Sequence, residues 1–341
     1  SKILSAKSCL SFNHLNHWKI SKIVPVYKKG RRSCPENYRP VALTCTLGRI
    51  LEAVVRIQLK NWLEKENLLP ESMCGFRSGK GTADAILRIT DGIKLNLAEK
   101  KKVMLICIDG RAAFDLARAE IIVESLRVLG VGDRTRRWFH DYLSDRIQYV
   151  QCGGERSGKW RVNIGVVQGG LLSPDLYNIL TLTLGLWNIE SDTTTYADDS
   201  GELVAADTSE ECEAKALRVI EGVKEWYENV GLQINPTKSE IMSFGFDAHG
   251  MEICGMNVTP SKSIRFLGCF IQDDLRWNVQ VDAVAGKLRQ AAGRIRNCGR
   301  LLSVNQRKQL YHAWAGGVMH SNALAYLPHL NVSQIRTLQT A

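Results

Sequence analysis

Several common sequence features are absent from this chain, and each absence excludes a class of protein. No run of about 18 apolar residues is present, which excludes a membrane-spanning helix, and no secretory signal is visible. None of the ten cysteines forms a C-x-x-C pair, and His14 and His17 lack cysteine partners at finger spacing. Neither a disulfide framework nor a zinc site is therefore expected. Internal repeats and low-complexity segments are also absent.

The composition is that of a folded, basic protein. Its 341 residues suggest about two domains, and 45% hydrophobic residues suffice for sizeable cores. The ten cysteines, several of which lie in apolar runs as Cys107 does, are expected to be reduced core residues of an intracellular protein. With 45 Lys and Arg against 35 Asp and Glu, the formal charge is +10, which suits a nucleic acid partner but also a merely soluble basic protein. The chain begins without Met and ends abruptly, so we expect it to be a piece of a longer polypeptide.

Two adjacent carboxylates, Asp198 and Asp199, stand between a threonine-rich run and an apolar run. Residues 193–196 favour a strand and residues 203–206 a second one, which predicts a β-hairpin with both aspartates at its turn. Held near one locus, the two carboxylates would repel each other strongly without a cation. For the pair taken alone, a solvated turn is the alternative.

A third carboxylate, Asp109, follows the continuous apolar run 103–108. Such a run predicts a strand buried on both faces with Asp109 at its carboxyl end, although a helix cap is the alternative role for this residue. The order of elements around it predicts a βαββαβ sheet that brings Asp109 beside Asp198 and Asp199.

Three clustered carboxylates need divalent cations, and oxygen ligands favour Mg²⁺ or Mn²⁺. Two such ions about 3.5–4 Å apart would activate a hydroxyl and stabilise the leaving oxygen of an in-line phosphoryl displacement. A hairpin over residues 19–43 with a Lys/Arg-rich tip would neutralise a triphosphate, with a solvated basic loop as the alternative.

Helical periodicity predicts several further elements. An apolar stripe over residues 47–62, with Leu47, Ile50 and Ile57 among its members, leaves Glu52 on the surface. Residues 119–160 predict a helix and then a hairpin through two glycines. Ser173 is expected to cap a helix whose apolar stripe runs to residue 187, just after a glycine-flanked loop where backbone could approach a ligand. A capping box at 208–211 predicts the start of a helix that runs to about residue 230. A hairpin is expected at 264–271, and basic helices are expected after residue 276.

The chain resembles the reverse transcriptase domain of non-LTR (LINE-type) retrotransposons, from about Trp18 to about Pro328. The motifs that carry the resemblance occur in the family's order. They are Pro25…Lys28-Lys29-Gly30, Asn37-Tyr38-Arg39-Pro40, Gly75-Phe76-Arg77, Asp109…Ala113-Phe114-Asp115, Gly165…Gln168-Gly169…Leu172-Ser173-Pro174, Tyr196-Ala197-Asp198-Asp199, Gly231-Leu232…Asn235…Lys238 and Phe266-Leu267-Gly268.

The resemblance implies roles for these residues. Asp109, Asp198 and Asp199 would be catalytic and hold two Mg²⁺ ions, and Lys238 could give a proton to the departing pyrophosphate. Phe114, next to Ala113, matches the steric gate that excludes a ribose 2′-hydroxyl. Lys28 or Lys29 would hold the triphosphate together with Arg39. Gln168 would lie under the incoming sugar and base. Arg77 would line the template side or the nucleotide site. Residues 266–268 resemble a primer grip.

The implied fold class is α+β, a right-hand polymerase with an antiparallel palm sheet and a helical thumb. Its expected limits are fingers at 1–98 with 119–160, palm at 99–275 and a truncated thumb at 276–341. The implied partners are an RNA template, a DNA primer and deoxynucleoside triphosphates, and no membrane is involved. The implied location is the nucleus of a cell. The oligomeric state and the host element are not specified, and the family's endonuclease is not in this chain.

The chain also departs from the family pattern. Residues 110–112 replace a more usual small-polar-then-lysine run, and Val167 stands where a proline is common. Two alternatives remain open at this point: a decayed or domesticated module that binds nucleic acid without catalysis, and an RNA-directed RNA polymerase. The second is disfavoured because its gate position typically carries a smaller polar residue, where this chain has Phe114.

Overall fold

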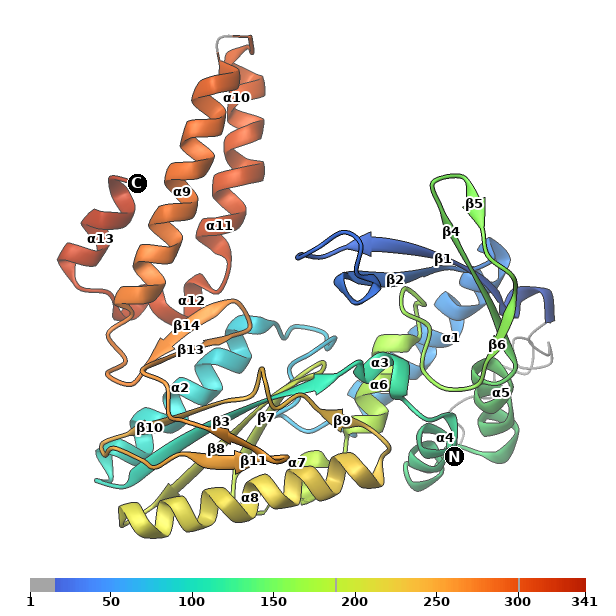
Figure 1. Ribbon diagram of the computed structural model, residues 1–341, viewed down its shortest axis with the longest axis horizontal. Coiled ribbons are helices and arrows are strands. Elements are labelled where there is room, and N and C mark those ends of the chain that lie inside the picture. Colours follow the sequence, from blue (N-terminus) through green and yellow to red (C-terminus); the bar gives the residue numbers. More distant parts are fainter. Residues whose placement is uncertain (1–15, 188, 300) are drawn as a thin grey trace. The chain divides into compact units, whose positions relative to one another are not determined.

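The computed structural model describes residues 16–187, 189–299 and 301–341, so Cys9 and His14 lie outside the described residues (Figure 1). The chain divides into two compact units. The first unit comprises the residues up to 76, 110–187 and 222–235, and the second comprises 77–109, 188–221 and 236–341. These limits differ from the expected limits of fingers, palm and thumb, which stay a prediction.

The second unit contains the predicted βαββαβ sheet. Its strands are β3 (Lys102–Arg111), β7 (Asp192–Tyr196), β8 (Asp199–Ala206) and β10 (Glu240–Phe244), in the order β10-β3-β8-β7 with every neighbouring pair antiparallel. β3 is a central strand, paired on both sides, and its residues 103–106 are fully buried. The strand runs two residues beyond Asp109, where Gly110 and Arg111 pair with β9 (Gln233–Ile234) in the first unit.

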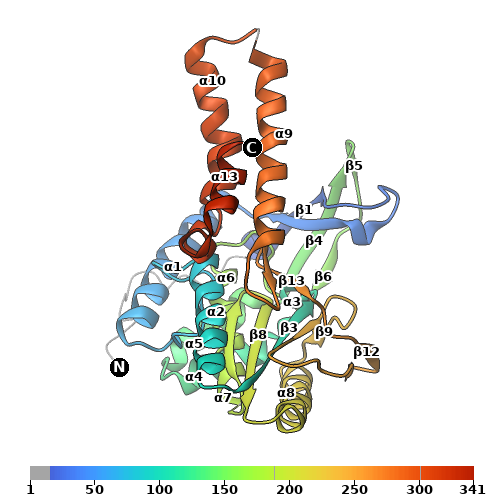
Figure 2. The ribbon, with the colours of Figure 1, turned by 90° about the vertical axis from the view of Figure 1, so that its left-hand side faces the viewer.

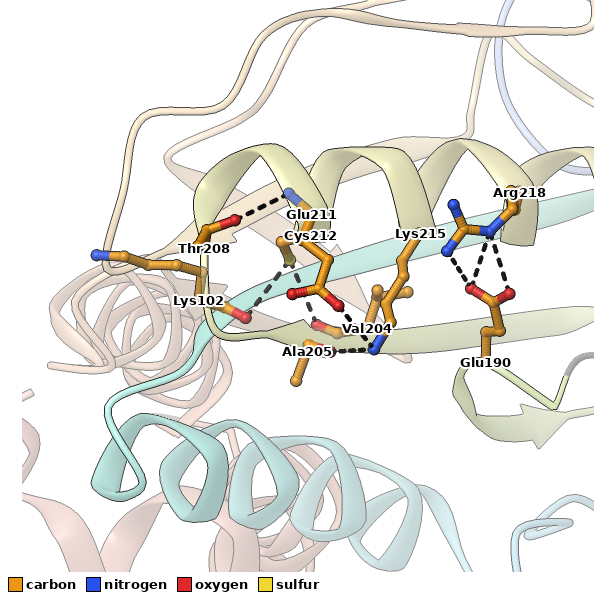
Figure 3. A network of polar contacts seen from close by, with 9 residues as sticks. All are labelled: Lys102, Glu190, Val204, Ala205, Thr208, Glu211, Cys212, Lys215 and Arg218. Atoms are coloured by element: carbon orange, nitrogen blue, oxygen red, sulfur yellow. Dashed lines mark hydrogen bonds and ion pairs between the residues drawn. The ribbon is translucent and has the colours of Figure 1, made fainter.

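Two long helices pack on this sheet, α2 (Thr82–Ala98) and α8 (Ser209–Asn229). Gly92 of α2 lies so close to the sheet that an added Cβ would be 2.7 Å from Leu203 Cδ2. At the start of α8, the Thr208 hydroxyl accepts the amide hydrogen of Glu211 at 3.2 Å, which confirms the predicted cap (Figure 3). Lys215 then donates to the carbonyl of Ala205 on β8.

The first unit is built on a second sheet. Strands β1 (Ile20–Tyr27) and β2 (Tyr38–Leu43) form the predicted basic hairpin, with the short helix η2 (Pro35–Asn37) in its connection and η1 (Asn16–Lys19) before it. β1 also pairs in parallel with β4 (Arg146–Cys152), which itself pairs with β5 (Glu155–Arg156) and β6 (Trp160–Val162). The hairpin predicted through Gly153 and Gly154 is the β4–β5 connection, so this prediction is confirmed.

The helices of the first unit are α1 (Thr46–Lys65), α3 (Ala113–Leu116), α4 (Ala119–Val128), α5 (Asp133–Leu143), α6 (Ser173–Thr181) and α7 (Leu184–Trp187). The single helix expected before Trp138 is in fact two, α4 and α5. Gly130 takes a φ of +89° in the connection, a left-handed conformation that ends a helix.

The buried face of α1 was predicted wrongly. Glu52 is 1% exposed rather than on the surface, and its carboxylate accepts the amide hydrogen of Leu171 at 2.8 Å. Leu47, Ile50 and Ile57, which were assigned to the apolar stripe, are exposed. The helix carries apolar residues on two faces, and the pattern alone does not say which of them meets the rest of the unit.

The start and end of α6 also differ from expectation. Leu172 rather than Ser173 precedes the helix, and the Ser173 hydroxyl donates instead to the carbonyl of Val167 at 2.7 Å. The helix stops at Thr181, which leaves Trp187 46% exposed on the separate helix α7 rather than in the core. A buried hydrogen bond to the preceding loop is therefore formed in place of a cap.

The remaining elements of the second unit are two hairpins and a helical region. The hairpins are β11 (Met251–Ile253) with β12 (Met256–Val258) and β13 (Ser263–Phe266) with β14 (Cys269–Gln272), the latter as predicted. The helical region comprises α9 (Asn278–Gly299), α10 (Val304–Tyr311), the π-helical turn η3 (His312–Gly316), α11 (Gly317–His320), α12 (Ala323–Tyr326), η4 (Leu327–His329) and α13 (Val332–Gln339). Figure 2 shows α10 lying alongside α9.

Cysteine and hydropathy predictions have mixed outcomes. None of the nine cysteines within the described ranges forms a disulfide. Cys152, Cys254 and Cys298 are exposed, so the expectation of core positions is wrong for these three. Among the described helices, none combines the length and the apolar character needed to cross a membrane.

Candidate active site

The two carboxylate motifs lie side by side in the second unit. In the β3–β8 pair, Asp109 and Asp199 are directly opposite each other, as the sequence predicted. Asp198 stands in the two-residue turn between β7 and β8, next to Ala197, whose φ of +56° is a left-handed conformation. A tight turn thus holds the pair at the end of the sheet beside Asp109.

The carboxylates repel one another. The pKa of Asp199 is raised to about 6, mainly by burial and then by the negative charges of Asp198 and Asp109, while the positive charge of Lys238 opposes the shift. Carboxylates whose charged form is disfavoured by burial and by neighbouring negative charges are concentrated at functional sites, because they destabilise the fold.

Lys238 supplies a positive charge at this place. Its Nζ lies 3.0 Å from Oδ2 and 3.2 Å from Oδ1 of Asp109. The lysine side chain is 60% exposed, whereas that of Asp109 is 20% exposed. Lys238, the predicted proton donor, therefore contacts Asp109, one of the predicted metal ligands. The role of Lys238 as a proton donor stays a prediction.

A cleft of about 340 Å³ opens beside the carboxylates. Asp109, Asp199 and Lys238 line it together with Phe266 and Leu267 of the β13–β14 hairpin. The hairpin turn consists of Leu267 and Gly268, both with positive φ, as a two-residue turn requires. Two of the predicted catalytic carboxylates therefore share one cleft of the second unit with two residues of the predicted primer-grip motif.

The donor set fits a hard divalent cation. Carboxylate oxygens are the ligands that Mg²⁺ prefers, and a cation would relieve the repulsion that raises the pKa of Asp199. Within the described residues, however, no three His, Cys, Asp or Glu side chains are already grouped as a set that could hold a metal ion. The three-carboxylate metal site predicted from the sequence thus stays a prediction.

The predicted triphosphate-binding residues belong to the β1–β2 hairpin of the first unit. Lys28, Lys29 and Arg39 are all exposed. The hairpin tip is ordered by the hydroxyl of Tyr27, which donates to the carbonyl of Gly30 at 2.6 Å, and by the amide of Lys28, which donates to the carbonyl of Asn37 at 2.8 Å. This order reduces the entropy that the tip would lose on binding an anion.

The predicted gate residue, Phe114, is held between two other rings. It stacks on Tyr177 with centroids 4.6 Å apart and meets Phe76 edge-on at 6.3 Å. Its neighbour Ala113 is 3% exposed, so the side chain of Ala113 packs in the interior. Contacts on two sides restrict the movement of the Phe114 ring.

Gln168 is paired with a residue for which the sequence suggested no role. Its Nε2 donates to Oδ1 of Asp115 at 2.6 Å. Asp115 is the last residue of the Phe114 motif, and this position is the one feature of the sequence that marks it. Arg77 belongs to the second unit, in the loop before α2, where it is half-buried, so both of its predicted roles remain open.

Comparisons with known proteins agree with this geometry. The sequence pattern described as "Reverse transcriptase (RNA-dependent DNA polymerase)" matches residues 26–271. The probable RNA-directed DNA polymerase from transposon BS of Drosophila melanogaster is 24% identical over 298 residues, which cover 82% of this chain and 32% of the relative. The RNA-directed DNA polymerase from mobile element jockey of the same fly is 21% identical over 296 residues, which cover 82% and 31%. The chain therefore spans about a third of the length of these curated relatives.

A solved structure supports the fold. Telomerase from Candida tropicalis, in complex with a TWJ fragment of telomeric RNA, aligns with a TM-score of 0.56 at 14% identity, covering 96% of this chain and 58% of the telomerase chain. At that identity the likeness concerns the fold alone, which is the right-hand polymerase fold predicted from the motifs. The resemblance to polymerases of mobile elements is likewise confirmed by the relatives. Because the matched pattern covers most of the sequence, the chain belongs to the reverse transcriptase (RNA-dependent DNA polymerase) family.

Proposed function

We propose that this chain is the polymerase domain of a non-LTR retrotransposon protein and extends a DNA primer on an RNA template. The observation that carries the proposal is the pairing of Asp109 with Asp199 on neighbouring strands, beside Asp198, in a cleft that also contains the primer-grip motif. Two-metal phosphoryl transfer needs carboxylates at the place where the primer end is held.

Reverse transcriptases depend on divalent cations in general. For this chain we propose that Asp109, Asp198 and Asp199 hold two Mg²⁺ ions, for which Mn²⁺ can substitute. When bound, the ions would supply charge neutralisation for the attacking and leaving oxygens. Lys238, which contacts Asp109, would hold the proton that the departing pyrophosphate takes up.

The first unit would bind the deoxynucleoside triphosphate. Lys28, Lys29 and Arg39 are exposed cations on an ordered hairpin, which suits a triphosphate. Phe114, restrained by Tyr177, would collide with a ribose 2′-hydroxyl and so select deoxynucleotides. A ring that could rotate away would discriminate less.

The partners follow from the same proposal. The telomerase that shares the fold was solved with an RNA fragment, and the net charge of +10 suits a polyanion. We propose an RNA template and a DNA primer whose backbone is followed by the basic side chains of α9, which are Lys287, Arg289, Arg294 and Arg296. The proposed site of action is the nucleus.

Primer extension tests this function. The purified chain is given poly(rA)/oligo(dT), dTTP and Mg²⁺, and the expected result is incorporation that requires Mg²⁺. Asp198→Asn should lower the rate by roughly two orders of magnitude, because the carboxylate charge is lost. Asp247→Asn, which changes an exposed aspartate of the same unit, is the matched control and should leave the rate unchanged.

Two results would contradict the proposal. Incorporation that survives Asp198→Asn would overturn the site assignment. A folded parent that binds the template-primer but incorporates no dTTP would instead support a module that binds nucleic acid without catalysis.

A further inference from the structure

The loop that carries Gln168 is attached on both sides by backbone hydrogen bonds. The amides of Gly165 and Val166 donate to the carbonyls of Ala117 and Phe114, each at 2.8 Å. On the other side, the amide of Ala42 on β2 donates to the carbonyl of Gln168 at 2.7 Å. These backbone hydrogen bonds, together with the bond from the Ser173 hydroxyl to the carbonyl of Val167, set the backbone position of Gln168.

The side chain of Gln168 is oriented by a different contact. Its Nε2 donates to Oδ1 of Asp115 at 2.6 Å, which is short for a hydrogen bond between nitrogen and oxygen. Bonds of this kind to a carboxylate are stronger than bonds between neutral groups. Although Asp115 is an exposed residue, partial loss of hydration raises the pKa of its carboxyl, whereas the bond from Gln168 and the positive charge of Lys28 lower it.

The pair lies beside open space. Gln168 and Asp115 line a pocket of about 210 Å³ in the first unit, whose wall also includes Gln148 and Arg146. With one N–H of Gln168 engaged by Asp115, the amide can present its carbonyl oxygen and its second N–H to a ligand. Without Asp115, nothing in this contact would prevent the amide from turning over and exchanging its donor and acceptor.

We infer that Asp115 is a positioning residue that sets the amide orientation of Gln168 and, through it, the affinity for the incoming deoxynucleotide. The inference rests on the proposed function, in which Gln168 lies under the incoming sugar and base. Asp115 itself need not touch the nucleotide. Its effect should disappear when Gln168 is absent, and this property separates it from a residue that simply stabilises the loop.

A double-mutant cycle measures that property. Single-nucleotide incorporation of dTTP is compared for the parent, Asp115→Ala, Gln168→Ala and the double variant. Asp115→Ala should raise KM by roughly tenfold with kcat within about twofold, because a charge-assisted bond that orders the binding group is lost. The double variant should match Gln168→Ala. Asp115→Asn keeps an acceptor oxygen and should restore most of the lost affinity.

The control and the contrary results are well defined. Asp133→Ala removes an exposed carboxylate at the start of α5 and should leave both constants unchanged. If the effects of Asp115→Ala and Gln168→Ala multiply in the double variant, Asp115 does not act through Gln168 and the inference fails. It also fails if Asp115→Ala leaves KM at the parent value.

A spectroscopic readout keeps the inference separate from the proposed function. In protein labelled with ¹⁵N-glutamine, the side-chain amide signals of Gln168 are identified by their loss in Gln168→Ala. They should move upfield in Asp115→Ala and stay near the parent position in Asp115→Asn. Unmoved signals would overturn the inference even in an active enzyme. Moved signals in a chain that incorporates no dTTP would support the Asp115 contact and refute only the polymerase assignment.

Discussion

Glu202 should make this protein less stable as the pH rises from acid to neutral. The residue lies in the middle of β8 and is fully buried, and its Oε2 accepts hydrogen bonds from the hydroxyls of Ser191 at 2.7 Å and Thr193 at 2.6 Å. Its Oε1 finds no hydrogen-bond partner among the residues that the structure describes. Burial raises the pKa of Glu202 from 4.5 to about 6, although the two hydroxyl bonds oppose the shift.

The direction and size of the effect follow from this shift. Below pH 4.5 the carboxyl is protonated in both the folded and the unfolded chain, so its ionisation does not lower the free energy of unfolding. Between pH 4.5 and 6 the unfolded chain releases the proton and the folded chain keeps it, so stability is lost as the pH rises. The loss is complete above pH 6 and amounts to about 2 kcal/mol, at 1.36 kcal/mol per pKa unit.

Urea unfolding at a series of pH values, followed by circular dichroism, measures the effect. Glu202→Gln cannot ionise, so its free energy of unfolding minus that of the parent should grow by about 2 kcal/mol between pH 4 and 7. A constant offset from altered hydrogen bonding does not affect this change. Glu252→Gln, at an exposed position of β11, controls for the loss of one charge. A difference between Glu202→Gln and the parent that is the same at pH 4 and pH 7 would refute the reasoning.

Two further predictions concern the first unit. Phe114→Val removes the ring that stacks on Tyr177. In single-nucleotide assays it should raise the ratio of UTP to dTTP incorporation by at least about tenfold. An unchanged ratio would exclude Phe114 as the gate. Gly165→Ala should destabilise the Gln168 loop by about 1–3 kcal/mol in thermal unfolding, since φ is +93° and the new Cβ would lie 2.7 Å from the carbonyl oxygen of Asp115. Gly153→Ala, with positive φ but open space around it, is the control, and an equal loss there would show that crowding contributes nothing.

Local patterns were sufficient for the elements that carry the carboxylates. The apolar run before Asp109 and the threonine-rich and apolar runs on either side of Asp198 and Asp199 each specify a strand by short-range chemistry, and the βαββαβ order leaves few ways to pair them. For α1, the pattern of apolar residues predicted the wrong buried face. Its apolar residues occupy two faces, and Glu52 is buried because the amide of Leu171, which is distant in sequence, needs an acceptor.

Side-chain pairs between distant segments were out of reach of the sequence. Nothing near Asp175 indicates that Arg56 donates to it at 2.7 Å, and nothing near Gln168 indicates that Asp115 orients its amide. The exact partner depends on how two separately formed elements approach each other, which is a property of packing and not of periodicity.

The sequence by itself therefore determined the family, the order of the strands and the position of the predicted catalytic carboxylates, because these depend on β-favouring and apolar runs and on motifs that occur in a set order. Only the tertiary structure decided which face of α1 is buried, that Lys238 contacts Asp109, and that Asp115 holds Gln168. Those contacts arise when distant elements pack and leave a polar group that must find a partner.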